Sequence, residues 1–144
     1  MQGIVLDLEA HKIVSREGDL ASEIFFLQSG KLLVCTLSGT EVKAIARISA
    51  GEFVGELSFF DGRPRASYVV TLEKSQLIQI QKHEIAGHLP KWYSQVATNI
   101  TKKIRLLDNI IHTTHLRKSN DEDNRPLTME EQHSLFQLIS KQNA

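Results

Sequence analysis

The chain has 144 residues, with 17 basic and 17 acidic side chains and a formal net charge of zero. This length accommodates one domain with a hydrophobic core and a helical appendage, and it excludes two full domains. The balanced charge gives no general electrostatic drive toward nucleic acid or an anionic membrane, so any anion site must be local.

The N-terminal segment and the cysteine content bear on localisation. Residues 1–12 lack both the basic start and the continuous apolar stretch of a signal peptide. No apolar run in the sequence is long enough to span a bilayer. The single cysteine, Cys35, rules out a disulfide framework, and its apolar surroundings favour a buried, inert thiol. We therefore expect a cytoplasmic protein without a membrane partner.

Short apolar runs rich in β-branched residues alternate with turn signals between His11 and Gln81. The runs of strand length are EIFFLQ, KLLVCTL, VKAIARI, SYVVTL and SQLIQIQ. Glycine-containing turns lie at residues 17–19, 29–30, 38–39, 50–51 and 61–62. This pattern predicts a mainly β domain, an antiparallel roll of the jelly-roll type. A metal-binding cupin is the rival β-roll, but it needs paired histidines on one strand, and the chain has no His-x-His.

The segment GELSFFDGRPRAS, residues 55–67, has the features of an anion site. Gly55 allows the backbone to approach a ligand closely. A helix that starts at Glu56 would direct the unpaired N–H groups of Leu57 and Ser58 outward, where they favour negative charge.

The same segment ends in a candidate phosphate ligand. Pro64 is expected to end the short helix, because its φ is fixed and it has no N–H donor. Arg65 follows in extended backbone, where its guanidinium can bind a phosphate through two parallel hydrogen bonds. A second interpretation makes Glu56 and Arg65 an internal salt bridge of a ligand-free β-roll.

GELSFFDGRPRAS resembles the phosphate-binding cassette of cyclic nucleotide-binding domains, and EGDLASEIFFLQSGKLLV is similar to the second and third strands of that family. The similarity spans roughly residues 8 to 115. It implies that Glu56 accepts the ribose 2′-hydroxyl and that Arg65 pairs with the cyclic phosphate. Ala66 stands where cyclic-GMP-selective members tend to have threonine, which favours cyclic AMP over cyclic GMP as the ligand. The ligand-binding residues are then Gly55, Glu56, Leu57, Ser58, Arg65, Ala66 and Ser67.

The period of the apolar residues changes to that of a helix after Lys82. One stripe steps alternately by four and three: Tyr93, Ala97, Ile100, Ile104, Leu107, Ile111 and Thr114. We expect one helix from about Ser94 to His115. The resemblance to bacterial activators implies that this helix forms a homodimer through residues 93–114. The alternative is that the stripe packs only on its own β-roll. The sequence leaves the base-capping residue open, with Arg105 and Asn109 of the long helix as the candidates.

A polar segment and a capping box follow the long helix. Residues 117–127 are charged and polar, which predicts a solvated linker. Thr128 and Glu131 have the spacing of a capping box and predict a second, short helix. Its apolar residues require a covering surface on this domain, on a second copy or on a partner: Leu135, Phe136, Leu138 and Ile139. The expected division is a β-roll in 1–92, the long helix in 93–116, the linker in 117–127 and the tail helix in 128–144.

Other residue patterns favour no further chemistry. His112 and His115 lie three residues apart, but no third ligand is marked nearby, so we predict no metal site. The chain has no Gly-x-Ser-x-Gly elbow and no phosphate loop of the Walker type, so we predict no catalytic residues and no cofactor. The residues after Leu116 are too few for a helix-turn-helix and carry no basic face, which argues against direct DNA binding.

We therefore expect a cyclic nucleotide sensor that signals to a separate, unidentified output protein and has no catalytic activity. The resemblance implies that closure on the phosphate shifts the short helix and repacks Phe59 or Phe60 against helices that begin near Lys82. One alternative is a scaffold with a degenerate nucleotide site that acts through its C-terminal helix. Another is the sensory part of a longer regulator.

Overall fold

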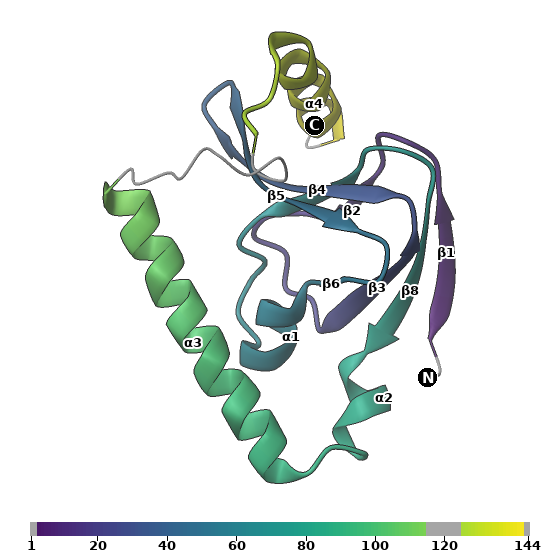
Figure 1. Ribbon diagram of the computed structural model, residues 1–144, viewed down its shortest axis with the longest axis vertical. Coiled ribbons are helices and arrows are strands. Elements are labelled where there is room, and N and C mark those ends of the chain that lie inside the picture. Colours follow the sequence, from purple (N-terminus) through teal and green to yellow (C-terminus); the bar gives the residue numbers. More distant parts are fainter. Residues whose placement is uncertain (1–2, 115–124, 143–144) are drawn as a thin grey trace.

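Two four-stranded antiparallel sheets form the body of the protein, and helices cover part of their surface (Figure 1). The computed structural model describes residues 3–114 and 125–142. One sheet has the order β1-β8-β3-β6 and the other β2-β7-β4-β5. The strands are β1 Ile4–Leu8, β2 Ile13–Ser15, β3 Glu23–Ser29, β4 Lys31–Ser38, β5 Glu41–Ser49, β6 Phe53–Val54, β7 Tyr68–Thr71 and β8 Ser75–Gln81. This architecture confirms the predicted mainly β roll.

The space between the two sheets is filled by apolar side chains. Leu27 and Leu77 of the first sheet are buried against Leu32 and Val69 of the second. Because successive side chains of a strand point to opposite faces, the same strands present other residues to the outside of the roll. The outer face of the second sheet therefore needs a cover of its own.

All five expected runs are strands, namely β3, β4, β5, β7 and β8, whereas β1, β2 and β6 were not expected. β2 and β6 are only three and two residues long, too short to show a period of two. β1 lies at a sheet edge, and its Ile4 and Val5 are exposed on both sides of the pleat. Burial alternates only from Val5 to Leu8, a stretch too short to stand out in the sequence.

The helices are α1 Glu56–Asp61, α2 Lys82–Ala86, α3 Lys91–Thr114 and α4 Met129–Gln142. α3 begins two residues before the expected boundary at 93. The carbonyl of Pro90 accepts hydrogen bonds from the N–H groups of Tyr93 at 3.0 Å and Ser94 at 3.4 Å, so the first turn is already closed there. The expected linker lies outside the described residues from 117 to 124.

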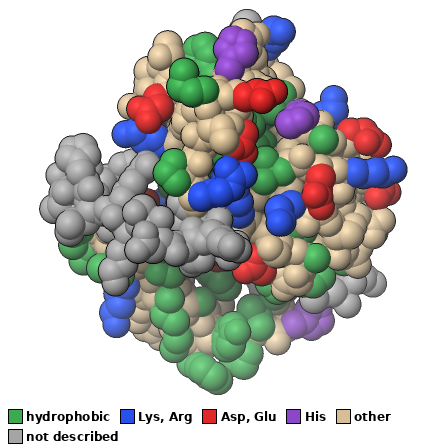
Figure 2. All heavy atoms as spheres, turned by 45° about the horizontal axis from the view of Figure 1, so that its top comes forward, with side chains coloured by type: hydrophobic (Ala, Val, Ile, Leu, Met, Phe, Trp, Pro, Cys, Tyr) green, Lys and Arg blue, Asp and Glu red, His purple; other side chains and the backbone are tan. Residues whose placement is uncertain are grey.

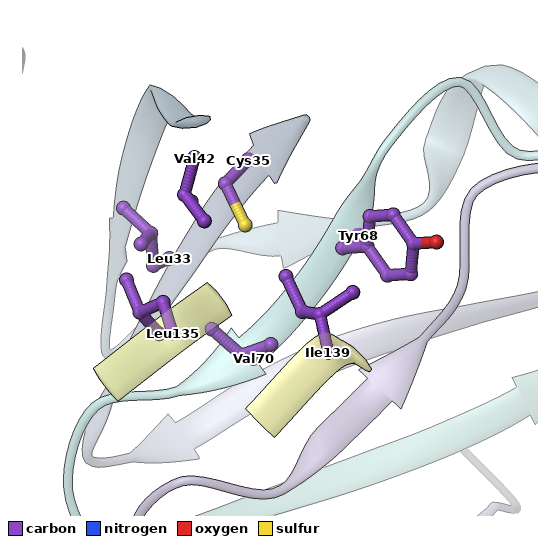
Figure 3. Packing of buried hydrophobic residues seen from close by; sticks show 7 residues of the cluster. All are labelled: Leu33, Cys35, Val42, Tyr68, Val70, Leu135 and Ile139. Atoms are coloured by element: carbon purple, nitrogen blue, oxygen red, sulfur yellow. The ribbon is translucent and has the colours of Figure 1, made fainter. Parts of the chain in front are cut away.

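α4 covers the outer face of the second sheet. Its buried Leu135 and Ile139 lie against Leu33, Val42 and Val70 (Figure 3). This domain is therefore the covering surface for these two residues, among the three possibilities that the sequence left open.

The capping box at the start of α4 is confirmed. The N–H of Thr128 donates to Oε1 of Glu131 at 3.1 Å, and the N–H of Glu131 donates to Oγ1 of Thr128 at 3.2 Å.

α3 leans on α1 and leaves its apolar stripe at the surface. The stripe residues Tyr93, Ile100, Ile104 and Leu107 are between 44% and 59% exposed. The alternative that the stripe packs only on its own β-roll is therefore wrong for these residues. The space-filling view shows apolar side chains toward its lower end, where the N-terminal part of α3 lies (Figure 2). The side chains at positions 111 and 114 lie outside the described part of the structure.

Candidate functional site

A pocket of about 190 Å³ lies between α1 and the second sheet. All seven residues that the resemblance implicated line it: Gly55, Glu56, Leu57, Ser58, Arg65, Ala66 and Ser67. Sequence reasoning did not identify the opposite wall, which comes from three different strands and includes Val34, Ala46, Ile48 and Val69. These residues carry only the general apolar signal of a strand, so no local pattern distinguishes them from core.

Glycine at both ends gives α1 its position. Gly55 precedes the helix with a φ of 89°, and Gly62 follows it with a φ of 68°, both in the left-handed region. The N–H of Gly62 donates to the carbonyl of Ser58, which closes the last turn. The helix therefore ends at Asp61 through Gly62, and the prediction that Pro64 ends it is wrong.

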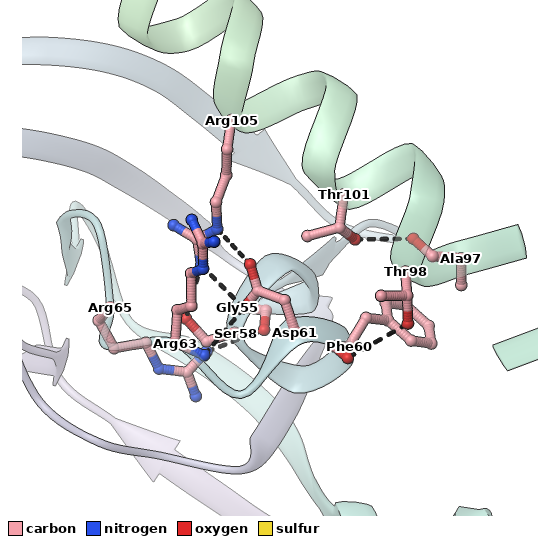
Figure 4. A network of polar contacts seen from close by, with 10 residues as sticks. All are labelled: Gly55, Ser58, Phe60, Asp61, Arg63, Arg65, Ala97, Thr98, Thr101 and Arg105. Atoms are coloured by element: carbon pink, nitrogen blue, oxygen red, sulfur yellow. Dashed lines mark hydrogen bonds and ion pairs between the residues drawn. The ribbon is translucent and has the colours of Figure 1, made fainter. Parts of the chain in front are cut away.

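Arg65 is buried beside the start of α1. Its side chain is only 4% exposed. Nη1 donates to the carbonyl of Gly55 at 2.8 Å (Figure 4). Nη2 donates to the carbonyl of Glu23 at 2.6 Å. The Glu23 carboxylate lies 3.9 Å from Nη2. A Cβ on Gly55 would lie 2.6 Å from Nη1 and would displace the guanidinium, and the φ of 89° independently favours glycine there.

These contacts leave part of the Arg65 guanidinium unmatched. Its Nε is buried and has no hydrogen-bond partner among the described residues. Burial lowers the pKa of Arg65, and the carboxylates of Glu23, Glu56 and Asp19 oppose this effect. A guanidinium remains charged in proteins, so the pocket wall carries a fixed positive charge.

The second interpretation, an internal salt bridge between Glu56 and Arg65, is not what the structure shows. No ion pair joins these two side chains in the described part of the chain, and Glu56 is exposed at the pocket. The carboxylate that approaches Arg65 belongs to Glu23, which sequence reasoning missed. Glu23 is 42 residues away along the chain, so no spacing rule connects the pair.

Arg105 joins α3 to α1. Its Nε donates to one carboxylate oxygen of Asp61 and its Nη2 to the other at 3.1 Å, while Nη2 lies 3.5 Å from Oγ of Ser58 (Figure 4). Burial alone would raise the pKa of Asp61, but the hydrogen bonds from Arg105 and from the backbone N–H of Arg63 lower it on balance. Neither of the two candidate base-capping residues lines the pocket: Arg105 approaches it only through Ser58, and Asn109 is exposed.

A second cavity of about 200 Å³ separates α1 from α2 and the start of α3. Phe59 and Phe60 form one side of it, and Lys82, Ile85 and Thr98 are among the residues opposite. Phe59 is buried, and its ring meets that of Phe60 edge to face. The two aromatic residues expected to repack against the helices after Lys82 already pack in one apolar cluster with Ile85 of α2, and the cavity lies beside them.

Other reactive groups lie away from the pocket or are inert. Burial raises the pKa of the Cys35 thiol to about 12, so the thiolate is not formed at neutral pH. Within residues 3–114 and 125–142, no three histidine, cysteine or acidic side chains gather as metal ligands. His112 and His115, for which we predicted no metal site, fall outside the residues whose side chains are described. Over the same ranges, no helix combines the length and apolar character that crossing a bilayer requires.

Comparison with known proteins agrees with this geometry. The family model for the cyclic nucleotide-binding domain matches residues 5–89, more than half of the chain. The Pycsar effector protein XpPycTIR of Xanthomonas perforans is 26% identical over 113 residues, which are 76% of this chain and 36% of the relative. The cyclic AMP receptor protein of Thermus thermophilus is 26% identical over 101 residues, 67% of this chain and 47% of the relative.

The chain spans less than half the length of these curated relatives. Among solved structures, the regulatory domain of Toxoplasma gondii PKA with cAMP has a TM-score of 0.59 and 24% identity. That similarity covers 67% of this chain and 35% of the solved chain. It supports the fold described above.

Proposed function

Because this chain belongs to the family of cyclic nucleotide-binding domains, we propose that it is a sensor that binds cyclic AMP in the pocket beside α1. The observation that carries the proposal is the state of Arg65. A guanidinium that is buried at a pocket wall, with its Nε unmatched, is suited to an anionic ligand, since a buried charge is stabilised by a counter-charge.

The neighbouring groups suit the rest of a cyclic nucleotide. Leu57, Ser58 and Ala66 line the pocket with Arg65, so their amides would bind the phosphate beside it, and the exposed Glu56 carboxylate would accept the ribose 2′-hydroxyl. The apolar strand residues on the other wall provide a surface for the base. Ala66 offers no side-chain hydroxyl to a guanine amino group, which favours cyclic AMP over cyclic GMP.

The output is a conformational change carried by α1. When the ligand draws in Arg65 and the first amides of α1, the other end of this helix moves against α3, to which Asp61 and Arg105 connect it. Phe59 or Phe60 then fills the cavity in front of α2. Two packing states with different ligand affinities are sufficient for such signalling.

The long helix provides the route to other chains. The exposed stripe of α3 suits pairing with a second copy, because a helix with apolar residues at this spacing buries them in a seam. The proposed protein binds its ligand without transforming it and passes the signal to a separate protein or to further domains. The proposal includes the division of the chain into a nucleotide-binding β-roll up to residue 92, a long helix up to 116, a linker up to 127 and a tail helix.

Thermal unfolding with and without nucleotide tests the proposal against the ligand-independent scaffold. Cyclic AMP at a hundred times its dissociation constant should add about 2.7 kcal/mol to the free energy of unfolding. Cyclic GMP at the same concentration should add less. A melting temperature that neither nucleotide moves at millimolar concentration would contradict the proposal and favour the scaffold.

A further inference from the structure

β5 faces two different sites because its side chains change sides at a bulge. The pairing register with β4 skips Ile45. Before this point, Val42 and Ala44 pack in the apolar cluster beneath α4. After it, Ala46 and Ile48 line the nucleotide pocket. Without the bulge all four residues would lie on one face, so the extra residue is what connects the two sites through one strand.

β4 connects the same two sites by simple alternation. Leu33 and Cys35 point into the cluster beneath α4, while Val34 between them lines the pocket. The two strands are paired along their length from Lys31 to Ser38. If contacts on one face shift the two strands, the side chains on the other face shift as well, because a close-packed sheet transmits displacement.

α4 is held to these strands by specific contacts as well as by burial. Gln132 pairs with both backbone groups of Val42: its Oε1 accepts the N–H at 2.7 Å, and its Nε2 donates to the carbonyl. Just before α4, the carbonyl of Arg125 accepts a hydrogen bond at 3.1 Å from Nη1 of Arg47, which lies between two residues of the pocket wall. Ile139 is fully buried beneath the helix.

We propose that the outer face of β4 and β5 is a docking surface for α4, and that docking there and nucleotide binding strengthen each other. The inference rests on the proposed function of the pocket on the other face. A docked α4 holds the pocket wall in one arrangement, so less conformational entropy is lost when the ligand binds. Because the coupling between two sites is reciprocal, the bound ligand in turn favours the docked helix. The matched family segment ends at residue 89, so α4 is an addition to it.

Two aspartate variants of α4 distinguish the effect of undocking the helix from the effect of adding a negative charge. Ile139→Asp places a charge in the buried cluster, whereas Gln137→Asp adds the same charge at an exposed position. In calorimetric titrations with cyclic AMP, we expect binding to be about tenfold weaker for Ile139→Asp than for Gln137→Asp, within the usual range of coupling between sites. In the unaltered chain, cyclic AMP should slow hydrogen exchange of the α4 amides.

Gln132→Ala provides a second variant if Ile139→Asp does not fold. It removes the paired hydrogen bonds to Val42 and leaves the apolar cluster intact, so we expect severalfold weaker binding with retained fold. Equal affinities for cyclic AMP in the docking and control variants, together with α4 exchange that the nucleotide leaves unchanged, would overturn the linkage alone. A wild-type chain that binds no nucleotide would overturn the proposed function and the linkage together.

Discussion

α3 and α4 both carry apolar residues at helical spacing, yet those of α4 are buried on the roll and those of α3 are exposed. α4 places Leu135 and Ile139 at 3% and 0% exposure on the roll. α3, which is longer, leaves Ile104 and Leu107 at 44% and 59% exposure. The spacing identifies an amphipathic helix in both cases, but the surface that covers it depends on where the fold brings the chain.

The two helices also differ in what attaches them. α4 is attached by buried apolar side chains and by bonds to backbone groups of β5. α3 meets α1 through polar groups, chiefly the Asp61–Arg105 ion pair and the Thr98 hydroxyl, which donates to the carbonyl of Phe60. A few polar contacts are easier to re-form in a second arrangement than a packed apolar cluster is, so α3 is the helix suited to move and α4 the one suited to stay.

We expect the largest effect on stability when a buried side chain of α4 is truncated. Leu135→Ala should lower the free energy of unfolding by about 2 to 5 kcal/mol, because it leaves a cavity beneath the helix. Leu106→Ala on α3 should change it by less than about 0.5 kcal/mol, since that side chain is 60% exposed. Urea unfolding measures both. Similar losses in the two variants would remove the contrast between the helices.

The stripe of α3 should matter for association instead. We expect the double variant Ile104→Asp, Leu107→Asp to raise the dissociation constant of a homodimer at least a hundredfold, about 2.8 kcal/mol, because like charges would meet across a two-fold seam. Replacing Lys102 and Lys103 by aspartate on the same helix is the control. Analytical ultracentrifugation measures the dissociation constants. A wild-type chain that is monomeric at high micromolar concentration, with and without nucleotide, would contradict a homodimer formed by the α3 stripe.

Breaking the ion pair should loosen α3 without loosening α4. Asp61→Asn removes the charge that faces Arg105 in a largely buried pair, which should cost about 1 to 3 kcal/mol. We expect faster hydrogen exchange in α3 and unchanged exchange in α4. Asp108→Asn, which removes a carboxylate of α3 itself, is the control. If both helices exchange faster by the same factor, α1 does not hold α3 selectively.

Acid should produce the smallest effect on α4, at the first turn of the helix. Hydrogen bonds from the Arg125 side chain, and then from Thr128, lower the pKa of Glu131 from its ordinary 4.5 to about 2. A depressed pKa stabilises the folded state above the ordinary value, and this contribution is lost as the pH falls from about 4.5 through 2. Protection of the first α4 amides should decline over that window. Glu131→Gln should flatten the decline, and an unchanged profile would refute the assignment.

Short sequence patterns predicted the features that depend on residues close together in the chain. The capping box of α4 involves residues three apart, and α1 begins where Gly55 and Glu56 indicated. The contacts that connect these parts do not appear in any window of sequence: Asp61 and Arg105 are 44 residues apart, and Val42 and Gln132 are 90 apart. The pocket residues of the cassette were predictable because they all lie in the short segment 55–67. Glu23 and the strand wall were not.

The bulge at Ile45 is the clearest limit of pattern reasoning. VKAIARI reads as one strand, and it is one, but a constant alternation would place Val42 and Ala46 on the same face. The extra residue reverses the second half, and only the pairing with β4 reveals it. Which residues of β5 face α4 and which face the pocket therefore depends on tertiary structure.

Calorimetric titration of Arg65→Ala with cyclic AMP tests the central claim most directly, with Arg63→Ala as the matched control. Arg63 is an exposed arginine two residues away, whereas Arg65 is buried at the pocket. We predict that Arg65→Ala weakens binding by about 2 to 5 kcal/mol while the domain stays folded, and that Arg63→Ala leaves the affinity nearly unchanged. A folded Arg65→Ala variant that binds cyclic AMP as tightly as the Arg63→Ala control would contradict the account.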